Sequence, residues 1–186
     1  MWLYHALYAT SLLLADAARA TLGTVAVTVI AALAGWRRDA IGLSLTPRQG
    51  WWWWIRLALA FGAVGLVLAI AFVALFPPEF PYQAGEPLRR IYMVGLSAPL
   101  LEETIHRLAF CTAAVAVSGR WPTIAASGLL FGALHIVYGN PDPSNMVGGF
   151  VLAWSFLKSG SILVPVALHS LGNLGLLAFN LVVASL

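Results

Sequence analysis

Two adjacent glutamates and an arginine interrupt an otherwise apolar part of the chain. Glu102, Glu103 and Arg107 lie within the run from Leu100 to Arg107. Glu103 and Arg107 are spaced i, i+4 with the acid first, which is the favourable order for an ion pair on a helix. Glu102 points about 100° away from Glu103 on a helix and has no obvious basic partner. A free carboxylate in apolar surroundings suits a general base or a general acid.

Two histidines and one amide recur in two further hydrophobic segments. His135 ends the run that begins at Phe131, and His169 and Asn173 lie one helical turn apart in the last segment. A lone histidine in an apolar helix is more often a packing residue, and the charges around position 103 could equally fix helix packing. The joint occurrence of a carboxylate, two imidazoles and an amide on three segments favours a site that activates a water and holds an oxyanion.

The composition places these residues in a membrane protein. Of 186 residues, 61% are apolar and 9% are charged, whereas soluble domains average about 45–50% apolar and about 25% charged residues. This excludes a soluble globular domain, a disordered chain and a nucleic-acid-binding protein. Each charge at the centre of a bilayer costs about 2.5–3.5 kcal/mol, so intramembrane ionisable residues indicate a functional site. The single cysteine, Cys111, excludes an intrachain disulfide and a cysteine-based zinc site.

Gly, Pro and polar residues divide the chain into hydrophobic segments, which predict an all-α fold, a polytopic membrane helical bundle of about six transmembrane helices. The expected spans are, in chain order, 2–36, 51–76, 88–117, 122–138, 144–157 and 161–184. Pro99 is expected to bend or break the third span, and Ser144 or Asn145 is expected to cap the fifth. For the first span a cleaved signal peptide is the alternative, although its n-region carries no Lys or Arg.

Aromatic and basic residues indicate how the spans lie in the bilayer. The run from Trp51 to Trp54 is interpreted as an anchor at the membrane interface rather than as a ligand platform. Basic residues are more frequent in the loops after the first, third and fifth spans than in the loops after the second and fourth. By the positive-inside rule the first group of loops is cytoplasmic, so both termini face outward. The first group holds Arg37, Arg38, Arg48, Arg120 and Lys158, and the second holds Arg89 and Arg90.

The three motifs together resemble those of the CPBP family, the CAAX proteases and bacteriocin-processing enzymes. The family pattern is Glu-Glu-x-x-x-Arg, then Phe-x-x-x-His, then His-x-x-x-Asn or Asp. The matching residues are, in chain order, Glu102-Glu103…Arg107, Phe131…His135 and His169…Asn173. The resemblance covers residues 88–186 and implies that they form a CPBP-like catalytic four-helix core. Residues 1–87 would add two N-terminal transmembrane helices and their loops to the same membrane domain.

The resemblance implies an intramembrane protease of the glutamic type. Glu102, helped by His135, would activate the attacking water, and His169 and Asn173 would stabilise the tetrahedral oxyanion. No cofactor is expected. If the enzyme depended on a metal instead, Glu102, His135 and His169 would be an acceptable set of zinc ligands.

The neighbours of the expected catalytic carboxylate depart in part from the family pattern. The resemblance gives Glu103 and Arg107 the role of positioning Glu102 and its helix. The family often has an aromatic residue before the arginine and a glycine after it, whereas this chain has His106 and Leu108. His106 follows Glu102 at i+4, so it could hydrogen-bond the carboxylate or face a neighbouring helix.

The expected function is hydrolysis of a peptide bond in a membrane-anchored peptide or protein, near a C-terminal anchoring or sorting segment. The resemblance implies a compact bacterial member that is integral to the inner (cytoplasmic) membrane and has no nucleic-acid partner. Two other classes stay open on the sequence. One is a non-catalytic membrane protein that confers bacteriocin immunity or acts as a scaffold. The other is a small proton-coupled transporter that uses Glu102 and the histidines as a relay.

Overall fold

The computed structural model describes residues 41–75 and 87–183, together with Thr21, Val25, Thr28, Val29 and Ala32. Over these residues the regular structure is helical, and the only β-type contact is an isolated bridge between Leu43 and Ser161. The all-α prediction is therefore confirmed for this part of the chain. Most of the predicted first span and the proline-rich segment before residue 87 lie outside the described residues.

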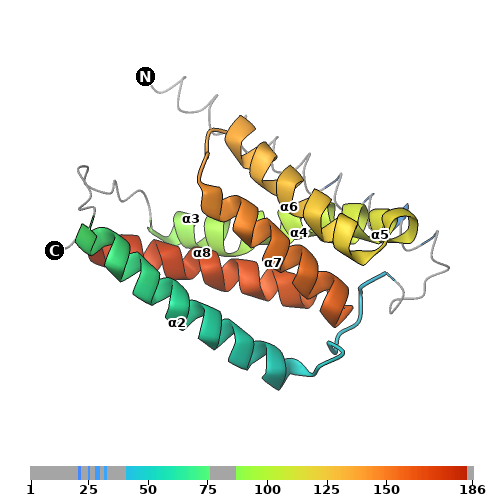
Figure 1. Cartoon of the computed structure of the whole chain (residues 1–186), viewed down its shortest axis with the longest axis horizontal. Coiled ribbons are helices and arrows are strands. Elements are labelled where there is room, and N and C mark those ends of the chain that lie inside the picture. The colour runs from blue at the N-terminus through green and yellow to red at the C-terminus, as the bar shows by residue number, and fades with distance from the viewer. Residues whose placement is uncertain are drawn as a thin grey trace.

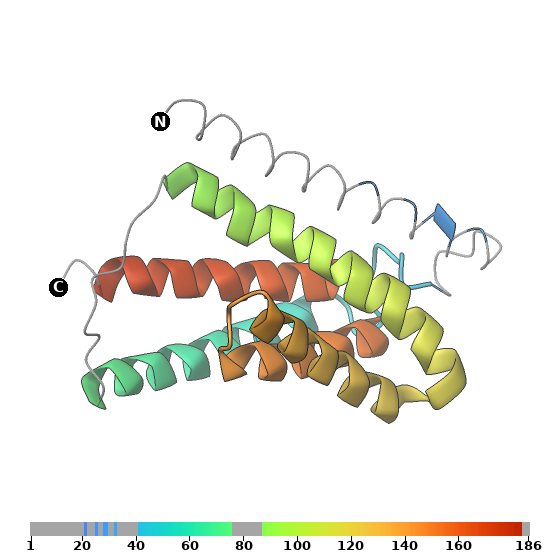
Figure 2. The ribbon, with the colours of Figure 1, turned by 90° about the horizontal axis from the view of Figure 1, so that it is seen from above.

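From residue 87 to residue 118 the chain runs as one continuous helical rod (Figure 2). Within this rod α-helical and π-helical stretches alternate. The rod consists of α3 (Pro87–Tyr92), η2 (Met93–Ser97), α4 (Ala98–Glu103), η3 (Thr104–Cys111) and α5 (Thr112–Ser118), where η marks a π-helix. The other helices labelled in Figure 1 are α2 (Trp51–Leu75), α6 (Arg120–Val137), α7 (Pro143–Ser159) and α8 (Leu163–Val183). Helix α6 packs on α7, α7 packs on α8, and α8 packs on both η2 and α4.

Helices α2 and α8 are the two described helices that are long and apolar enough to cross a bilayer. Helix α2 has 25 residues and α8 has 21, and a span needs roughly 20. Nearly all of α2 is exposed on the isolated chain, and Trp54 is its one buried residue. An apolar surface of this kind suits contact with lipid, because lipid tails are as apolar as leucine.

The core lies where η3, α6 and α7 meet. Its buried side chains are Leu108, Cys111, Ile124, Ala153 and Phe156. The segment before α2 is bound to the turn between α7 and α8. The Arg48 N–H donates to the Ser159 carbonyl at 3.0 Å, and the Ile162 N–H donates to the Gly42 carbonyl at 2.7 Å. These backbone bonds fix the start of α2 beside the start of α8.

Helix α7 is capped by Asp142 and not by Ser144 or Asn145, so the predicted cap is wrong. The Asp142 carboxylate accepts a hydrogen bond from the Ser144 backbone N–H at 2.8 Å. Pro143 follows as the first helical residue, where its missing N–H would have no partner in any case. Asp is among the preferred N-cap residues, and its charge suits the positive end of the helix dipole. At the other end Gly160, with φ 66°, turns the chain toward α8.

Of the bend or break expected at Pro99, the break does not occur, and the helix continues through a π-helical turn. In η2 the Ala98 N–H donates to the carbonyl of Met93, five residues earlier. In an α-helix a proline ring would clash with the carbonyl of the residue four positions before it. A single π-helical turn widens the backbone at such a point without ending the helix. The rod therefore continues on both sides of Pro99.

Glycines let α6 and α7 approach closely. Gly128 of α6 lies against the ring of Phe150 of α7. Gly149 of α7 faces Phe131: a Cβ at position 149 would lie 2.9 Å from the Phe131 Cβ and 3.1 Å from the Gly128 Cα. Small residues at helix contacts are typical of membrane bundles. The contact fixes the position of α6, which carries His135.

Gly149→Ala is expected to lower the stability of the protein by about 1–3 kcal/mol, the usual cost of overpacking a close contact. The measurement is thermal unfolding of the detergent-purified protein, followed by tryptophan fluorescence. Gly148→Ala is the matched control, since a Cβ at Gly148 meets no atom within 4 Å. Equal melting temperatures for the two variants would contradict the close approach of α6 and α7 at Gly149.

Candidate active site

Two charged residues of the rod, Glu103 and Arg107, form a buried ion pair where α4 meets η3. Arg107 Nε donates to Glu103 Oε2 at 2.8 Å, and both side chains are 0% exposed. The ion pair predicted from their spacing is confirmed. Arg107 Nη1 also donates to Ser127 Oγ of α6, which fastens the rod to that helix. Removal of either charged partner would leave the other charge buried and unpaired.

Glu103 has a second partner, His169 of α8. His169 Nδ1 lies 2.9 Å from Glu103 Oε1. An ionised carboxylate only accepts, so Nδ1 donates, and Nε2 is the nitrogen without a proton in the neutral ring. That Nε2 lies 3.9 Å from Glu102 Oε2. Glu103 thereby orients the imidazole toward Glu102 while it holds α8 against α4.

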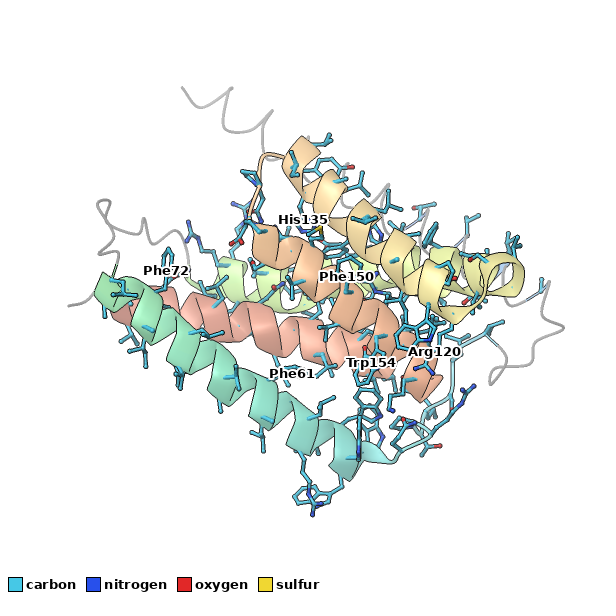
Figure 3. All side chains as sticks on the ribbon, in the orientation of Figure 1. Phe61, Phe72, Arg120, His135, Phe150 and Trp154 are labelled. Carbon is cyan, nitrogen blue, oxygen red and sulfur yellow. The ribbon has the colours of Figure 1, made fainter. Side chains whose placement is uncertain are left out.

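His135 is oriented in the same way by a backbone carbonyl. Its Nδ1 lies 2.9 Å from the carbonyl oxygen of Phe131, one turn earlier in α6. Because a carbonyl only accepts, Nδ1 again carries the proton and Nε2 is free in the neutral ring. His135 Nε2 lies 3.9 Å from Glu102 Oε2. Figure 3 shows His135 toward the C-terminal end of α6, near the connection to α7.

Glu102 Oε2 is the atom toward which the two imidazoles converge. Both Nε2 atoms lie 3.9 Å from it. This oxygen is buried and has no hydrogen-bond partner among the described residues, although the side chain as a whole is 33% exposed. A distance of 3.9 Å is too long for a direct hydrogen bond, but one water could bridge the carboxylate and an imidazole. The arrangement suits activation of a water by a carboxylate with the help of an imidazole.

Phe131 packs against every ring of the site, a role that its place in the motif did not reveal. Its ring centroid lies 4.4 Å from that of His135, 5.1 Å from that of His106 and 5.8 Å from that of His169. The guanidinium carbon of Arg107 lies 5.2 Å from the same centroid. Phe131 is 2% exposed, so its ring is a fixed apolar wall of the site.

A helical series on α6 is the pattern that could have revealed these contacts. Ser127, Phe131 and His135 follow one another at i, i+4 spacing and therefore lie on one face of the helix. Ser127 accepts from Arg107, and the other two residues face Glu102 and its neighbours. One face of α6 thus supplies a hydroxyl, a ring and an imidazole to the site.

His106 faces a neighbouring helix, which is the second of the two alternatives open for it. Its side chain is buried and stands edge-on to the ring of Phe131 on α6. It therefore fills the place of the aromatic residue that the family pattern has before the arginine. Among the described residues its Nδ1 has no hydrogen-bond partner.

Asn173 binds the backbone of the rod. Its Nδ2 donates to the carbonyl oxygen of Val94 in η2 at 2.9 Å. The Nε2 atoms of His135 and His169 each lie 3.9 Å from Glu102 Oε2, whereas the Asn173 amide is bound to the Val94 carbonyl. Three of the four expected catalytic residues thus lie together, and the fourth is bound to η2.

The expected alternative zinc ligands are Glu102, His135 and His169. Among the residues that the structure describes, no group of three His, Cys, Asp or Glu side chains is arranged to hold a metal ion. Ligand atoms around a tetrahedral zinc, with bonds of about 2.0–2.2 Å, lie roughly 3.3–3.6 Å apart. The carboxylate oxygen and each imidazole Nε2 lie 3.9 Å apart. These side chains would have to move closer together to bind zinc.

Comparison with known families finds one match that contains all three motifs. Residues 84–175 match the family model described as type II CAAX prenyl endopeptidase Rce1-like. The matched segment includes the rod, α6, α7 and the part of α8 that carries His169 and Asn173. Searches of curated proteins and of solved structures gave no significant match. Residues 84–175 therefore belong to the Rce1-like family of type II CAAX prenyl endopeptidases.

Proposed function

We propose that the protein is an intramembrane endopeptidase that hydrolyses a peptide bond of a membrane-associated peptide or protein. The observation that carries the proposal is the convergence of two imidazole Nε2 atoms on Glu102 Oε2, each at 3.9 Å. Family membership supports an endopeptidase of the CAAX type over a scaffold or a transporter. In this proposal the cleaved bond lies near a C-terminal membrane-anchoring or sorting segment of the substrate.

The first chemical step is attack by a water held between Glu102 and His135. Glu102 takes a proton from the water as the water oxygen bonds to the carbonyl carbon of the scissile bond, and the carbonyl electron pair moves to its oxygen. His135, oriented by the Phe131 carbonyl, binds the water through Nε2. When the tetrahedral intermediate collapses, the C–N bond breaks and Glu102 delivers the proton to the leaving nitrogen.

His169 stabilises the oxyanion in this mechanism. Protonated at Nε2, its imidazolium donates to the developing negative charge, while the Nδ1–H stays bound to Glu103. Glu103 and Arg107 position this ring and the helix that carries the catalytic carboxylate. The family resemblance gives Asn173 an oxyanion role as well. Its bond to the rod supports a positional role instead, and the variants described below distinguish the two.

We further propose that the active residues lie in a bundle of about six transmembrane helices in a bacterial inner membrane, with both termini outward. Residues 88–186 form the catalytic four-helix core, and residues 1–87 supply the first two spans. The apolar helices α2 and α8 support the membrane location. The excess of Lys and Arg in alternate loops supports the orientation.

We propose that hydrolysis requires no bound metal. Metal analysis of the purified, active protein is then expected to find well under one zinc per chain, and a strong zinc chelator is expected to leave the cleavage rate unchanged. Stoichiometric zinc that is lost together with activity would contradict this part of the proposal. The zinc ligands would then be Glu102, His135 and His169.

Co-expression of the chain with candidate membrane-tailed proteins from its own genome tests the function. A shortened product, identified by mass spectrometry, is expected with the native chain and is expected to be absent with Glu102→Ala or His135→Ala. His106→Phe is the matched control, because it changes a third histidine at the same phenyl ring and keeps an aromatic contact there. Unchanged product formation by both alanine variants would exclude the proposed chemistry and favour a non-catalytic role.

A further inference from the structure

Pro99 leaves one backbone carbonyl of the rod without a backbone donor. In η2 the Ala98 N–H reaches back five residues to Met93. With the same five-residue spacing, the backbone N–H of residue 99 would donate to the Val94 carbonyl, but proline has no N–H. In an α-helix the Ala98 N–H would donate to the Val94 carbonyl, but here it donates to the Met93 carbonyl instead. A carbonyl without a donor is costly inside a bilayer, because no water replaces the missing bond.

Asn173 of α8 supplies the missing donor. Its Nδ2 donates to the Val94 carbonyl oxygen at 2.9 Å. The two helices come this close because Gly95 has no side chain: a Cβ there would lie 2.6 Å from Cδ2 of Leu174. Side chains of neighbouring helices commonly bind the backbone groups that a proline frees in a membrane helix.

The bond to Val94 acts together with a second hydrogen bond between α8 and the rod. This second bond joins His169 Nδ1 to Glu103 Oε1 at 2.9 Å. The donors His169 and Asn173 lie one turn apart on α8, and the two acceptors lie on opposite sides of Pro99 along the rod. The stretch between the acceptors includes the catalytic carboxylate. Its position relative to α8 therefore depends on both bonds.

We infer that Asn173 is a positioning residue that replaces the backbone hydrogen bond lost at Pro99. By holding η2 against α8, it sets the rotation and depth of α4, and so the distance from Glu102 to the His169 imidazole. Pro99 acts with it, because the proline keeps the Val94 carbonyl available to α8. The inference deepens the proposed hydrolytic function and rests on that function only where cleavage is the readout.

A double-mutant cycle of Asn173→Ala and Pro99→Ala tests the inference. Alanine at position 99 restores a backbone N–H that can donate to the Val94 carbonyl. Loss of the Asn173 amide should therefore lower Tm and kcat less in the Pro99→Ala background than with Pro99 present. With Pro99 present, Asn173→Ala is expected to lower Tm by about 3–10 °C and kcat by roughly tenfold, with a smaller change in KM. In the Pro99→Ala background the same change is expected to lower Tm by less than about 2 °C and kcat by less than about threefold.

Two readouts keep this inference separate from the proposed function. Tm is followed by tryptophan fluorescence in detergent and needs no substrate, so it tests the bond between the helices even if no cleavage is found. The constants kcat and KM are measured with the substrate found by co-expression, well below the melting temperature of each variant. Asn180→Ala is the matched control, because it removes the same side chain further along the same helix. It is expected to leave all three quantities near their native values.

Equal losses on Asn173→Ala in both backgrounds would overturn the inference. If kcat alone fell equally in both while Tm stayed constant, direct contact of Asn173 with the oxyanion would be favoured. Should Pro99→Ala fail to fold, Pro99→Ser restores the same N–H and completes the cycle. Failure of both variants to fold would also contradict the inference, which requires that the rod accept a backbone donor at position 99.

Discussion

Glu102→Gln is expected to lower the rate of substrate cleavage by about 10²–10⁴-fold, the range that general base catalysis contributes. Glutamine keeps the size of the side chain but cannot take a proton from the attacking water. Glu102 Oε2 has no hydrogen-bond partner among the described residues, so the substitution breaks no bond of the fold at that atom. The melting temperature should therefore stay near the native value while activity is lost.

The rate is measured by mass spectrometry with purified protein in proteoliposomes, using the substrate found by co-expression. Asp142→Asn is the matched control, because it removes a carboxylate from the cap of α7 and leaves another good cap residue in its place. It is expected to cleave at the native rate. A Glu102→Gln variant that also cleaves at the native rate would exclude Glu102 as the base.

Arg107→Leu is expected to destabilise the protein by about 3–5 kcal/mol, the cost of leaving a buried charge without its partner. The Glu103 carboxylate and the Arg107 guanidinium are both 0% exposed, so water cannot replace the lost contact. Arg107 also donates to Ser127, and that hydroxyl would lose its donor. A loss of this size should lower the amount of folded protein in the membrane several-fold.

Replacing both members of the ion pair separates stability from activity. Glu103→Leu combined with Arg107→Leu is expected to recover much of the stability lost in Arg107→Leu, because an apolar pair often replaces a buried ion pair without loss. The melting temperature should still stay below the native value, because Ser127 and His169 lose their hydrogen-bond partners. Cleavage should not return, since His169 loses the carboxylate that binds its Nδ1. Thermal unfolding and cleavage assays on the same preparations measure the two effects.

Arg120→Leu is the control for the loss of an arginine. Arg120 is exposed at the start of α6, so its removal is expected to change stability by no more than about 0.5 kcal/mol. An Arg107→Leu variant as stable as the Arg120→Leu variant would contradict the structural role of the ion pair. Restored cleavage in the double leucine variant would contradict the role of Glu103 in orienting His169.

Helix positions could be predicted from the sequence because the features that delimit a helix are local. Hydrophobic runs between Gly, Pro and polar residues predicted α2 and α8 and the other described helices to within about two residues of their observed ends. The cap of α7 was predicted wrongly, since three neighbouring residues, Asp142, Ser144 and Asn145, all have side chains able to cap a helix. Only the backbone conformation at position 142 distinguishes them.

By itself, the sequence determined the class of protein and the groups available for chemistry. Scarce charge in a mostly apolar chain predicted membrane helices, and one helical spacing predicted the ion pair of Glu103 and Arg107. The spacing argument works within one helix, because residues at i and i+4 share a face whatever the helix packs against. The motif order then predicted which helices carry Glu102, His135 and His169.

Only the tertiary structure decided how those groups are held. It gives Glu103 a second partner in His169, and it binds Asn173 to the rod at the carbonyl that Pro99 frees. Contacts between helices depend on how closely and at what depth two helices pack, which is set by residues such as Gly95 that carry no chemistry. Sequence spacing fixes which side chains share a face, whereas packing between helices decides which faces meet.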